Sequence, residues 1–483
     1  MELYGEVRQT EQNTISGNPL SFFMTPKGIA VIGSLKEEGW FGGYIVIRDL
    51  LNGPYDGAIF PVNPSYREVL GIKAYTSVTA MEGIPDLAVI IRARNAVPSV
   101  LEECGRKGVR AAIVVSDGFS ERDDAGKRLQ QEIIAIAKRY GMRVMGPNTV
   151  GVVNTWSGVT TVPYERGYSE ILRGHLSIIS QSGLVGPQAL ELADLNIGIS
   201  RIIDLGNMCD VNETECLEYL EQDPETRVVS MYIENIRNGK TFMDVARRIS
   251  RIKPVLCLKS GRSSEGARAM ASHTGSMAGS DKVYEAAFRQ TGILRIDEFR
   301  ELLTLSKAFL FQPLPRANRI GIVSITGAGG IMALDCAEQF GLEPARLSQA
   351  TANKLESLFP GLGKNPVDFG PAAAVLGDFG KLYYETIKAL MEDDGVDSVF
   401  CTLYSTPLAD PSFYYQLFDD LSPVLKKPIT AWAYGTSQIQ LIELNSVLER
   451  KGIPLYFEIT PSIKALGLMA RYAAWIQRER TTR

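Results

Sequence analysis

The sequence predicts an α/β protein made of three successive domains, each with a parallel sheet. Short β-branched runs alternate with amphipathic segments along the chain, which is typical of strands joined by crossover helices. The chain has 483 residues, 45% of them hydrophobic, and is too long for one comfortable core. Turn-rich residues 154–174 and the break Pro313-Leu314-Pro315 divide it. We therefore expect domains at 20–153, 170–312 and 316–475.

The first domain is expected to be a Rossmann-like unit that ends near Gly151. Its apolar, β-branched runs are short enough for strands buried on both faces. These strands are expected at Gly28–Ile32, Ala58–Val62, Leu87–Ile91, Ala111–Val115 and Arg143–Met145, with helices at Val97–Lys107 and Gly126–Tyr140.

The second and third domains repeat this alternation of strands and helices. In the second, strands are expected at Leu176–Ile179, Ile199–Asp204, Val228–Tyr232 and Pro254–Leu258, closed by a helix that begins near Ile296. In the third, they are expected at Ile320–Ser324, Val396–Thr402 and Pro428–Trp432.

Composition excludes several classes of protein. The net charge is −4, from 51 basic and 55 acidic residues without long runs of one sign, which argues against a nucleic-acid surface. Six scattered cysteines without a C-x-x-C pair, and two histidines, give no metal-site spacing and suggest a reduced, cytoplasmic protein. Because no run of 18 apolar residues and no signal peptide occur, we expect neither membrane insertion nor secretion.

A glycine-rich loop follows the first predicted strand. It contains Gly33, Ser34, Lys36 and Gly42 and leads into a helix, an arrangement that lets backbone N–H groups meet phosphate oxygens. The second strand should end in an acid if the ligand were NAD, but it continues as Asn63-Pro64. A dinucleotide dehydrogenase is therefore disfavoured, whereas coenzyme A remains open; the loop could also be only a tight turn.

Two further loops with small residues also lead from a strand into a helix. Ser180-Gln181-Ser182-Gly183 follows the first strand of the second domain, and Thr326-Gly327-Ala328-Gly329-Gly330 follows that of the third. Serine and glycine at a helix start offer free backbone donors and the positive end of the helix dipole, so each loop is either an anion site or simply an N-cap.

His273 is the candidate nucleophile. It lies in Ala271-Ser272-His273-Thr274-Gly275, whose small side chains suggest a loop that presents a single imidazole. Imidazole is nucleophilic near neutral pH and can carry a phosphoryl group. Glu234 follows a buried strand, where its carboxylate could fix the tautomer of an imidazole or could be merely a solvated strand end.

Taken together, these segments resemble the NDP-forming acyl-CoA synthetases, the superfamily that includes succinyl-CoA synthetase and ADP-forming acetate–CoA ligase. The resemblance runs from about Pro26 into the C-terminal region. Its most specific pieces are Lys259-Ser260-Gly261-Arg262, Ser272-His273-Thr274-Gly275, Ser180-Gln181-Ser182-Gly183, Gly146-Pro147-Asn148, Phe60-Pro61-Val62-Asn63-Pro64 and Asn365-Pro366-Val367-Asp368.

The resemblance implies a role for each domain. The Rossmann-like domain would bind CoA, and two flavodoxin-like domains would follow, the first of them carrying the phosphohistidine. His273 matches the phosphorylated residue and Glu234 the glutamate that orients it; Ser182, Gly183 and Gly275 would bind phosphate. The implied CoA contacts are Gly33, Ser34, Lys36, Gly42, Asn63, Pro64 and Arg92.

The first loop departs from the family pattern. Residues 33–42 lack its usual Ala-Ser and Pro-Gly-Lys elements, which leaves the CoA contacts less certain. Arg92 and Arg94 stand where the family usually has an apolar residue, Pro and Ala, so two cations are expected near the CoA or acid site. They indicate either an anionic substrate or an exposed, solvated loop.

The resemblance also implies a partner. ATP-grasp domains, which bind ATP or ADP with Mg²⁺, have no counterpart here, so the chain is expected to be the α subunit of a hetero-oligomer with an ATP-grasp β subunit. The reaction implied is acid, CoA and ATP to acyl-CoA, ADP and phosphate. A CoA-binding sensor or scaffold that retained the fold is the alternative, and no metal site is expected on this chain.

Overall fold

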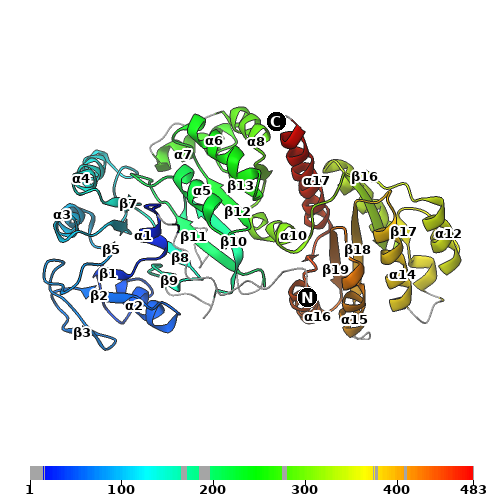
Figure 1. Cartoon of the computed structure of the whole chain (residues 1–483), viewed down its shortest axis with the longest axis horizontal. Coiled ribbons are helices and arrows are strands. Elements are labelled where there is room, and N and C mark those ends of the chain that lie inside the picture. The colour runs from blue at the N-terminus through cyan, green and yellow to red at the C-terminus, as the bar shows by residue number, and fades with distance from the viewer. Residues whose placement is uncertain are drawn as a thin grey trace. The chain divides into compact units, whose positions relative to one another are not determined.

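A computed structural model describes residue 15, 17–164, 171–183, 196–274, 280–373, 375, 379–406 and 411–481. The chain forms two compact units (Figure 1). One comprises residues 1–191, 198–253 and 259–287, and the other comprises residues 192–197, 254–258 and 288–483.

The three large sheets share one strand order. If the parallel strands of each set are counted along the chain, the order is 2-1-3-4-5 in the first two sheets, and the third has the same order when the two-residue strand β17, which pairs with β15 beside β16, is left out of the count. This is one of the common orders of doubly wound α/β sheets. The predicted α/β class is confirmed, and the sheets follow one another as expected, while the limits of the three domains stay predictions.

The first sheet has the order β2-β1-β5-β6-β7, and its paired strands are parallel. The predicted strands agree with it to within a residue at each end. Its strands are β1 (Gly28–Gly33), β2 (Ala58–Val62), β5 (Leu87–Ile91), β6 (Ala111–Val114) and β7 (Arg143–Met145), and a small hairpin is formed by β3 (Glu68–Val69) and β4 (Ile72–Lys73).

The helices of this part begin and end at residues suited to those positions. Asp123 caps α4 by accepting from the backbone N–H of Gly126 at 2.6 Å, and Gly141 ends that helix in the left-handed region. The neighbouring helices α3 and α4 lie side by side (Figure 1). The helices are α1 (Ser21–Met24), α2 (Gly43–Asn52), η1 (Arg94–Ala96), α3 (Val97–Lys107) and α4 (Asp124–Tyr140).

The second sheet contains seven strands, in the order β14-β13-β12-β10-β11-β8-β9. Its strands are β8 (Val152–Asn154), β9 (Val159–Thr160), β10 (Arg173–Ser180), β11 (Ile199–Asp204), β12 (Val228–Ile233), β13 (Val255–Lys259) and β14 (Leu294–Ile296). The helices between them are α5 (Glu213–Gln222), α6 (Gly239–Ser250), α7 (Ser264–Thr274) and α8 (Asp281–Thr291).

Two expectations for this sheet were wrong. The turn-rich stretch contains β9, which forms an antiparallel hairpin with β8 and extends the sheet beyond β11. The segment at Ile296 is the end of strand β14, because Leu294 and Ile296 are buried on either side of the less buried Arg295. The next helix begins only at Glu301.

The third sheet has the order β16-β15-β18-β19-β20, and β17 also pairs with β15. Its strands are β15 (Arg319–Ser324), β16 (Glu343–Pro344), β17 (Val367–Asp368), β18 (Ser398–Ser405), β19 (Ile429–Gly435) and β20 (Leu455–Tyr456). The helices are α9 (Glu301–Thr304), α10 (Ser306–Phe311), α11 (Gly327–Gln339), α12 (Gln349–Leu358), α13 (Gly370–Ala373), α14 (Phe379–Glu392), α15 (Ser412–Leu421), η4 (Ser422–Val424), α16 (Gln438–Arg450) and α17 (Ile459–Thr481).

Asn365 completes the edge of this sheet. Strand β15 pairs with β16 at its start and with β17 at its end. Between them, the Asn365 side chain accepts from Ile322 N at 2.8 Å and donates to Ile320 O at 2.9 Å. The amide side chain thus makes the hydrogen bonds that a paired strand would make between β16 and β17. This gives the Asn365-Pro366-Val367-Asp368 motif a structural role.

The β8–β9 hairpin ties the first sheet to the second through a series of backbone hydrogen bonds. Gly42 N, in the loop after β1, donates to Pro163 O at 2.8 Å, and Thr161 N donates to Val152 O at 2.9 Å. Asp204 N then donates to Gly151 O at 3.0 Å, and Leu205 N donates to Ser180 O at 2.8 Å. The loop after β1 and the loop after β10 are therefore held by one continuous framework.

Asp204 anchors this framework with its side chain as well. It is 1% exposed, and its Oδ2 accepts from Val150 N at 2.7 Å and from Thr149 Oγ1 at 3.0 Å. Burial raises the pKa of its carboxyl group to about 6, although these hydrogen bonds oppose the rise.

We expect Asp204→Asn to become more stable relative to the wild type as the pH rises from about 4 to about 7. The folded-state pKa of about 6 lies above the unfolded value of about 3.9, so the folded state binds the proton more tightly and loses stability across this window. The change amounts to about 3 kcal/mol. Urea unfolding of both proteins at several pH values measures it; a stability difference independent of pH would contradict the assignment.

A buried ion pair lies in the core beside the third sheet. Lys307 Nζ lies 2.6 Å from Glu449 Oε1, with the two side chains 4% and 0% exposed. Lys307 also donates to Leu455 O and lies 4.2 Å from the centre of the Tyr456 ring. Burial lowers the pKa of Lys307 and raises that of Glu449, so each charge depends on the other.

We expect Lys307→Met to lower the free energy of unfolding by about 3 to 5 kcal/mol, because it leaves the Glu449 charge buried without its partner. Denaturant unfolding measures this loss. Glu265→Ala, which breaks an ion pair with both side chains more than 70% exposed, is the control and should change stability little. Lys307→Met combined with Glu449→Leu should recover most of the loss; if it does not, the pair is not the cause.

Candidate functional site

The predicted CoA residues converge on the carboxyl edge of the first sheet. Gly33 ends β1 and Ser34 and Lys36 follow it, while Asn63 and Pro64 follow β2. Arg92 follows β5. Strand β1 lies between β2 and β5, so these loops meet where the strand order reverses, the position at which doubly wound sheets bind ligands.

Close contacts fix the shape of this edge. Asn63 Nδ2 donates to Gly33 O at 2.6 Å, joining the loops after β1 and β2. Gly33 has φ +144°, and a Cβ atom there would lie 1.9 Å from Ile91 O, so only glycine fits. Ser34 and Lys36 are exposed, whereas Gly42 is buried against the start of α2.

The two arginines after β5 have different roles. Arg94 Nη1 donates to Gly118 O at 2.6 Å and lies 3.1 Å from Asp123 Oδ2. Asp123 also caps α4, so Arg94 belongs to the framework of the first sheet, while the placement of two cations near the CoA or acid site stays a prediction. Arg92 is the exposed arginine at this edge.

A second edge is formed by the carboxyl ends of β10, β12 and β13, which are neighbours in the second sheet. Ser182 and Gly183 follow β10, and Glu234 follows β12. The helix that the sequence predicts after Gly183 falls at 184–195, outside the described residues.

Gln181 joins these two loops. Its side chain is 7% exposed; Oε1 accepts from Glu234 N at 2.7 Å and Asn235 N at 3.0 Å, and Nε2 donates to Asn235 O at 2.8 Å. Sequence reasoning gave this residue no role, because nothing local shows that a glutamine between two serines is buried. Gln181 fixes the backbone of Glu234 relative to the Ser182 loop.

The serine turn after β10 recurs after β15. Ser180 Oγ donates to Ser182 O at 2.7 Å, and Ser324 Oγ donates to Thr326 O at 2.7 Å. Thr326 then caps α11 by accepting from Gly329 N at 3.1 Å. Thr326 is thus the N-cap of α11, and an anion site at this loop stays a prediction.

Glu234 is a buried residue. Its side chain is 5% exposed, and Tyr232 Oη donates to Oε1 at a long 3.4 Å. The alternative of a solvated strand end is therefore wrong. A carboxylate held in an interior position is suited to orienting a second group.

His273 lies in the last turn of α7, and the expectation of a loop at 271–274 is wrong. Small residues suggested a loop, but alanine is the strongest helix former, and Glu265 and Arg268 pair along this helix at 2.6 Å. The His273 side chain and Gly275 lie outside what the structure describes, so the contact between His273 and Glu234 stays a prediction.

Lys259 places a buried cation at the end of β13. It is 1% exposed, donates to Ser260 O, and its Nζ lies 4.5 Å from the centre of the Tyr284 ring. Ser260 N donates to Ile233 O at 3.1 Å, which holds this end beside Glu234. The sequence analysis used Lys259 only as part of a motif. A lysine at the end of an apolar strand could by itself have indicated a candidate site residue.

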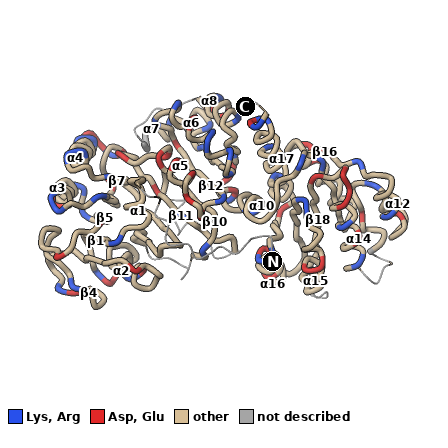
Figure 2. Tube along the Cα trace, viewed as in Figure 1, with Lys and Arg blue, Asp and Glu red and all other residues tan. Residues whose placement is uncertain are grey.

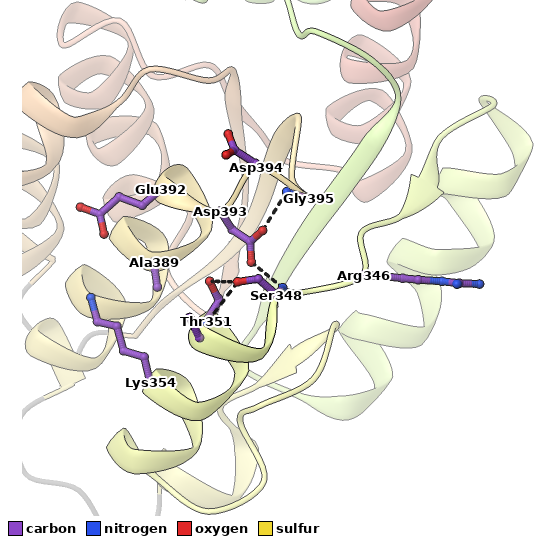
Figure 3. A pocket seen from close by; sticks show the side chains of 10 residues that line it. Arg346, Ser348, Thr351, Lys354, Ala389, Glu392, Asp393, Asp394 and Gly395 are labelled. Atoms are coloured by element: carbon purple, nitrogen blue, oxygen red, sulfur yellow. Dashed lines mark hydrogen bonds between the residues drawn. The ribbon is translucent and has the colours of Figure 1, made fainter.

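A pocket of about 470 Å³ lies elsewhere, beside the amino end of β18 (Figure 3). Its polar groups bond to one another: Asp393 accepts from Ser348 N at 2.8 Å and Gly395 N at 2.7 Å, while Arg346 points away from them. None of the predicted site residues lines it.

Basic and acidic residues are interspersed along the described trace (Figure 2). Among the described residues, no cluster of three or more His, Cys, Asp or Glu could hold a metal ion. None of the helices that the structure describes is long and apolar enough to span a membrane.

Comparison with known proteins assigns both edges to recognised domains. The CoA binding domain family matches residues 27–155. The succinyl-CoA ligase like flavodoxin domain family matches residues 173–309. The fold is thus a Rossmann-like CoA-binding domain followed by flavodoxin-like folds.

Whole proteins are similar over nearly the full chain. The ADP-forming acetate–CoA ligase I subunit alpha of Pyrococcus furiosus is 35% identical, with 94% of this chain and 98% of that protein covered. The ADP-forming acetate–CoA ligase II of Archaeoglobus fulgidus is 36% identical over 93% of this chain, which spans 66% of that longer protein.

A solved structure is also similar over nearly the full chain. The dinucleotide-forming acetyl-coenzyme A synthetase 1 of Candidatus Korarchaeum cryptofilum, in complex with phosphate and ADP, superposes with a TM-score of 0.87 at 30% identity, covering 96% of this chain and 99% of the other. The chain therefore belongs to the NDP-forming acyl-CoA synthetase superfamily.

Proposed function

We propose that this chain is the α subunit of an NDP-forming acid–CoA ligase, which converts acid, CoA and ATP reversibly into acyl-CoA, ADP and phosphate. The observation that carries the proposal is the pairing of two edges in one compact unit. One edge matches a CoA-binding domain and the other a succinyl-CoA ligase like domain, and the β8–β9 hairpin joins them.

The proposed chemistry uses an acyl phosphate. In the thioester-cleaving direction, a phosphate oxygen attacks the carbonyl carbon of acyl-CoA, the carbon–sulfur bond breaks and CoA leaves as its thiolate. The His273 imidazole then attacks phosphorus and the carboxylate leaves, which gives phosphohistidine. Ser182, Gly183 and Gly275 bind the phosphate, and Glu234 orients the imidazole.

CoA binds at the first edge. Backbone donors at Gly33 and Ser34, together with Lys36 and Arg92, meet its phosphates. Gly42, whose N–H donates to Pro163 O, holds the end of this loop, and Asn63 and Pro64 shape the neighbouring loop. The exposure of Lys36 and Arg92 at this edge supports their assignment.

The nucleotide, ATP or ADP, binds to a separate partner subunit. An ATP-grasp β subunit binds ATP or ADP with Mg²⁺ and exchanges the phosphoryl group with His273 in a hetero-oligomer. The Pyrococcus relative, called an α subunit, and the longer Archaeoglobus relative support this division. The six scattered cysteines, without a C-x-x-C pair, support a cytoplasmic location. The domain limits that we propose are 20–153, 170–312 and 316–475.

The full chain alone should bind CoA and should not bind NAD. Isothermal titration calorimetry measures both. Arg92→Ala should weaken CoA binding by about tenfold or more, since it removes a charged hydrogen-bond donor. Arg106→Ala, which removes an exposed arginine from α3, is the matched control and should leave the affinity unchanged. Tight NAD binding without CoA binding would exclude the ligase.

The full chain should also become labelled when it is incubated with acetyl-CoA and radioactive phosphate, without ATP and without a partner. The label should be stable in base, labile in acid and absent from His273→Ala. His175→Ala is the matched control, because His175 lies on β10 and its Nδ1 is 2.8 Å from Glu225 O. Glu234→Gln should slow labelling by about 10² to 10⁴.

Two results would contradict these assignments. If His273→Ala retains the label, the phosphoryl group is carried by another residue. Labelling of Glu234→Gln at the wild-type rate would leave Glu234 with a structural role only.

A further inference from the structure

Met208 has a backbone conformation that residues other than glycine rarely adopt. It lies in the loop after β11, and its φ of +52° falls in the left-handed region. This conformation is unfavourable for a side chain of this size, and it persists only where the surrounding structure imposes it. Such residues gather at functional sites, so the contacts of Met208 indicate what this loop does.

The backbone on both sides of Met208 is bonded to the loop after β7. Asn207 N donates to Pro147 O at 2.9 Å. On the other side, Cys209 N donates to Gly146 O at 2.9 Å. These acceptors follow the last strand of the first sheet, so that sheet holds the turn in its strained conformation.

The Asn207 side chain attaches the same turn a second time. Its Nδ2 donates to Glu121 Oε2 and, at 3.1 Å, to Gln130 Oε1. Glu121 also accepts from Phe119 N at 3.0 Å, so its carboxylate is fixed in the loop after β6. The position of Met208 is therefore set by loops of the first sheet.

The Met208 side chain in turn contacts the Gln181 amide. It is 4% exposed, and its sulfur accepts from Gln181 Nε2 at 3.2 Å. Nε2 donates its other proton to Asn235 O, while Oε1 accepts from the backbone N–H groups of Glu234 and Asn235. A thioether sulfur accepts hydrogen bonds and cannot donate them, so it suits the NH₂ side of the amide and not the oxygen side. Met208 thus completes the partners of the amide that holds Glu234.

We propose that Met208 is a positioning residue for phosphoryl transfer, which acts through the Gln181 amide on the backbone of Glu234. This inference rests on the proposed function, in which Glu234 orients the His273 imidazole. CoA binds at the first sheet in that function, whereas Glu234 follows a strand of the second. Met208 links them, because its backbone is held by the first sheet and its sulfur by the amide beside Glu234. A displacement of about 1 Å between reacting groups can cost about 100-fold in rate.

Met208→Leu tests the proposal, because leucine fills a similar volume and stays apolar but has no hydrogen-bond acceptor. The full chain is labelled with radioactive phosphate at several acetyl-CoA concentrations. The maximal labelling rate should fall about tenfold, because the loosened amide no longer fixes Glu234. The acetyl-CoA concentration that gives half the maximal rate should be unchanged. Met142→Leu, at a methionine that is 3% exposed in the apolar core beside the first sheet, is the matched control and should leave both values unchanged.

Gln181→Met tests whether Met208 acts through the amide. Methionine replaces glutamine with a side chain of similar length that cannot donate a hydrogen bond. This variant should be labelled about tenfold or more slowly than the wild type. Adding Met208→Leu to it should cause little further loss, because the interaction that Met208 serves is already gone. Two independent structural roles would instead give losses that multiply.

The outcomes separate this inference from the proposed function. If Met208→Leu keeps the wild-type maximal rate, or if the two losses multiply in the double variant, the positioning role is wrong and the ligase assignment stands. If the wild type itself is not labelled, the proposed function fails and the inference fails with it. Circular dichroism shows whether each variant is folded. Should Gln181→Met not fold, the comparison of Met208→Leu with Met142→Leu decides alone.

Discussion

The structure of the candidate site depends on the backbone hydrogen bonds of the β8–β9 hairpin. This hairpin extends the second sheet on one side and reaches the loop after β1 on the other, through Gly42 and Pro163. Buried Asp204 holds the same segment with its side chain, at Val150 and Thr149. Reactions between two bound groups require their relative position to be fixed, and a paired backbone fixes it better than isolated side-chain contacts.

Each edge is then completed by a few short-range constraints. At the first edge, the approach of Ile91 O leaves room only for Gly33, and Asn63 closes the gap between two loops. At the second, the buried amide of Gln181 fixes the backbone beside Glu234. Lys259, buried at the end of the neighbouring strand, donates to Ser260 O and lies against the Tyr284 ring, and so helps to fix the third side of this edge.

The fold could be predicted well from the sequence, because apolar β-branched runs such as 87–91 leave few alternatives to a buried strand. The site could be predicted only in part. Local patterns identified the loops at Gly33 and Ser182, but the burial of Gln181 and Glu234 depends on distant strands. Composition misled at His273, where alanines form a helix, and the acceptors of Arg94 at Gly118 and Asp123 could not be predicted because they lie far along the chain.

The serine turn that recurs after β10 and β15 separates what the turn requires from what the site requires. The same 2.7 Å bond forms at Ser180 and at Ser324. The following residue differs: Ile325 stands where the first loop has Gln181, and Thr402 Oγ1 accepts from the Ile325 N–H at 2.9 Å. The turn therefore forms without a glutamine, and the buried amide of Gln181 serves the backbone at Glu234 instead.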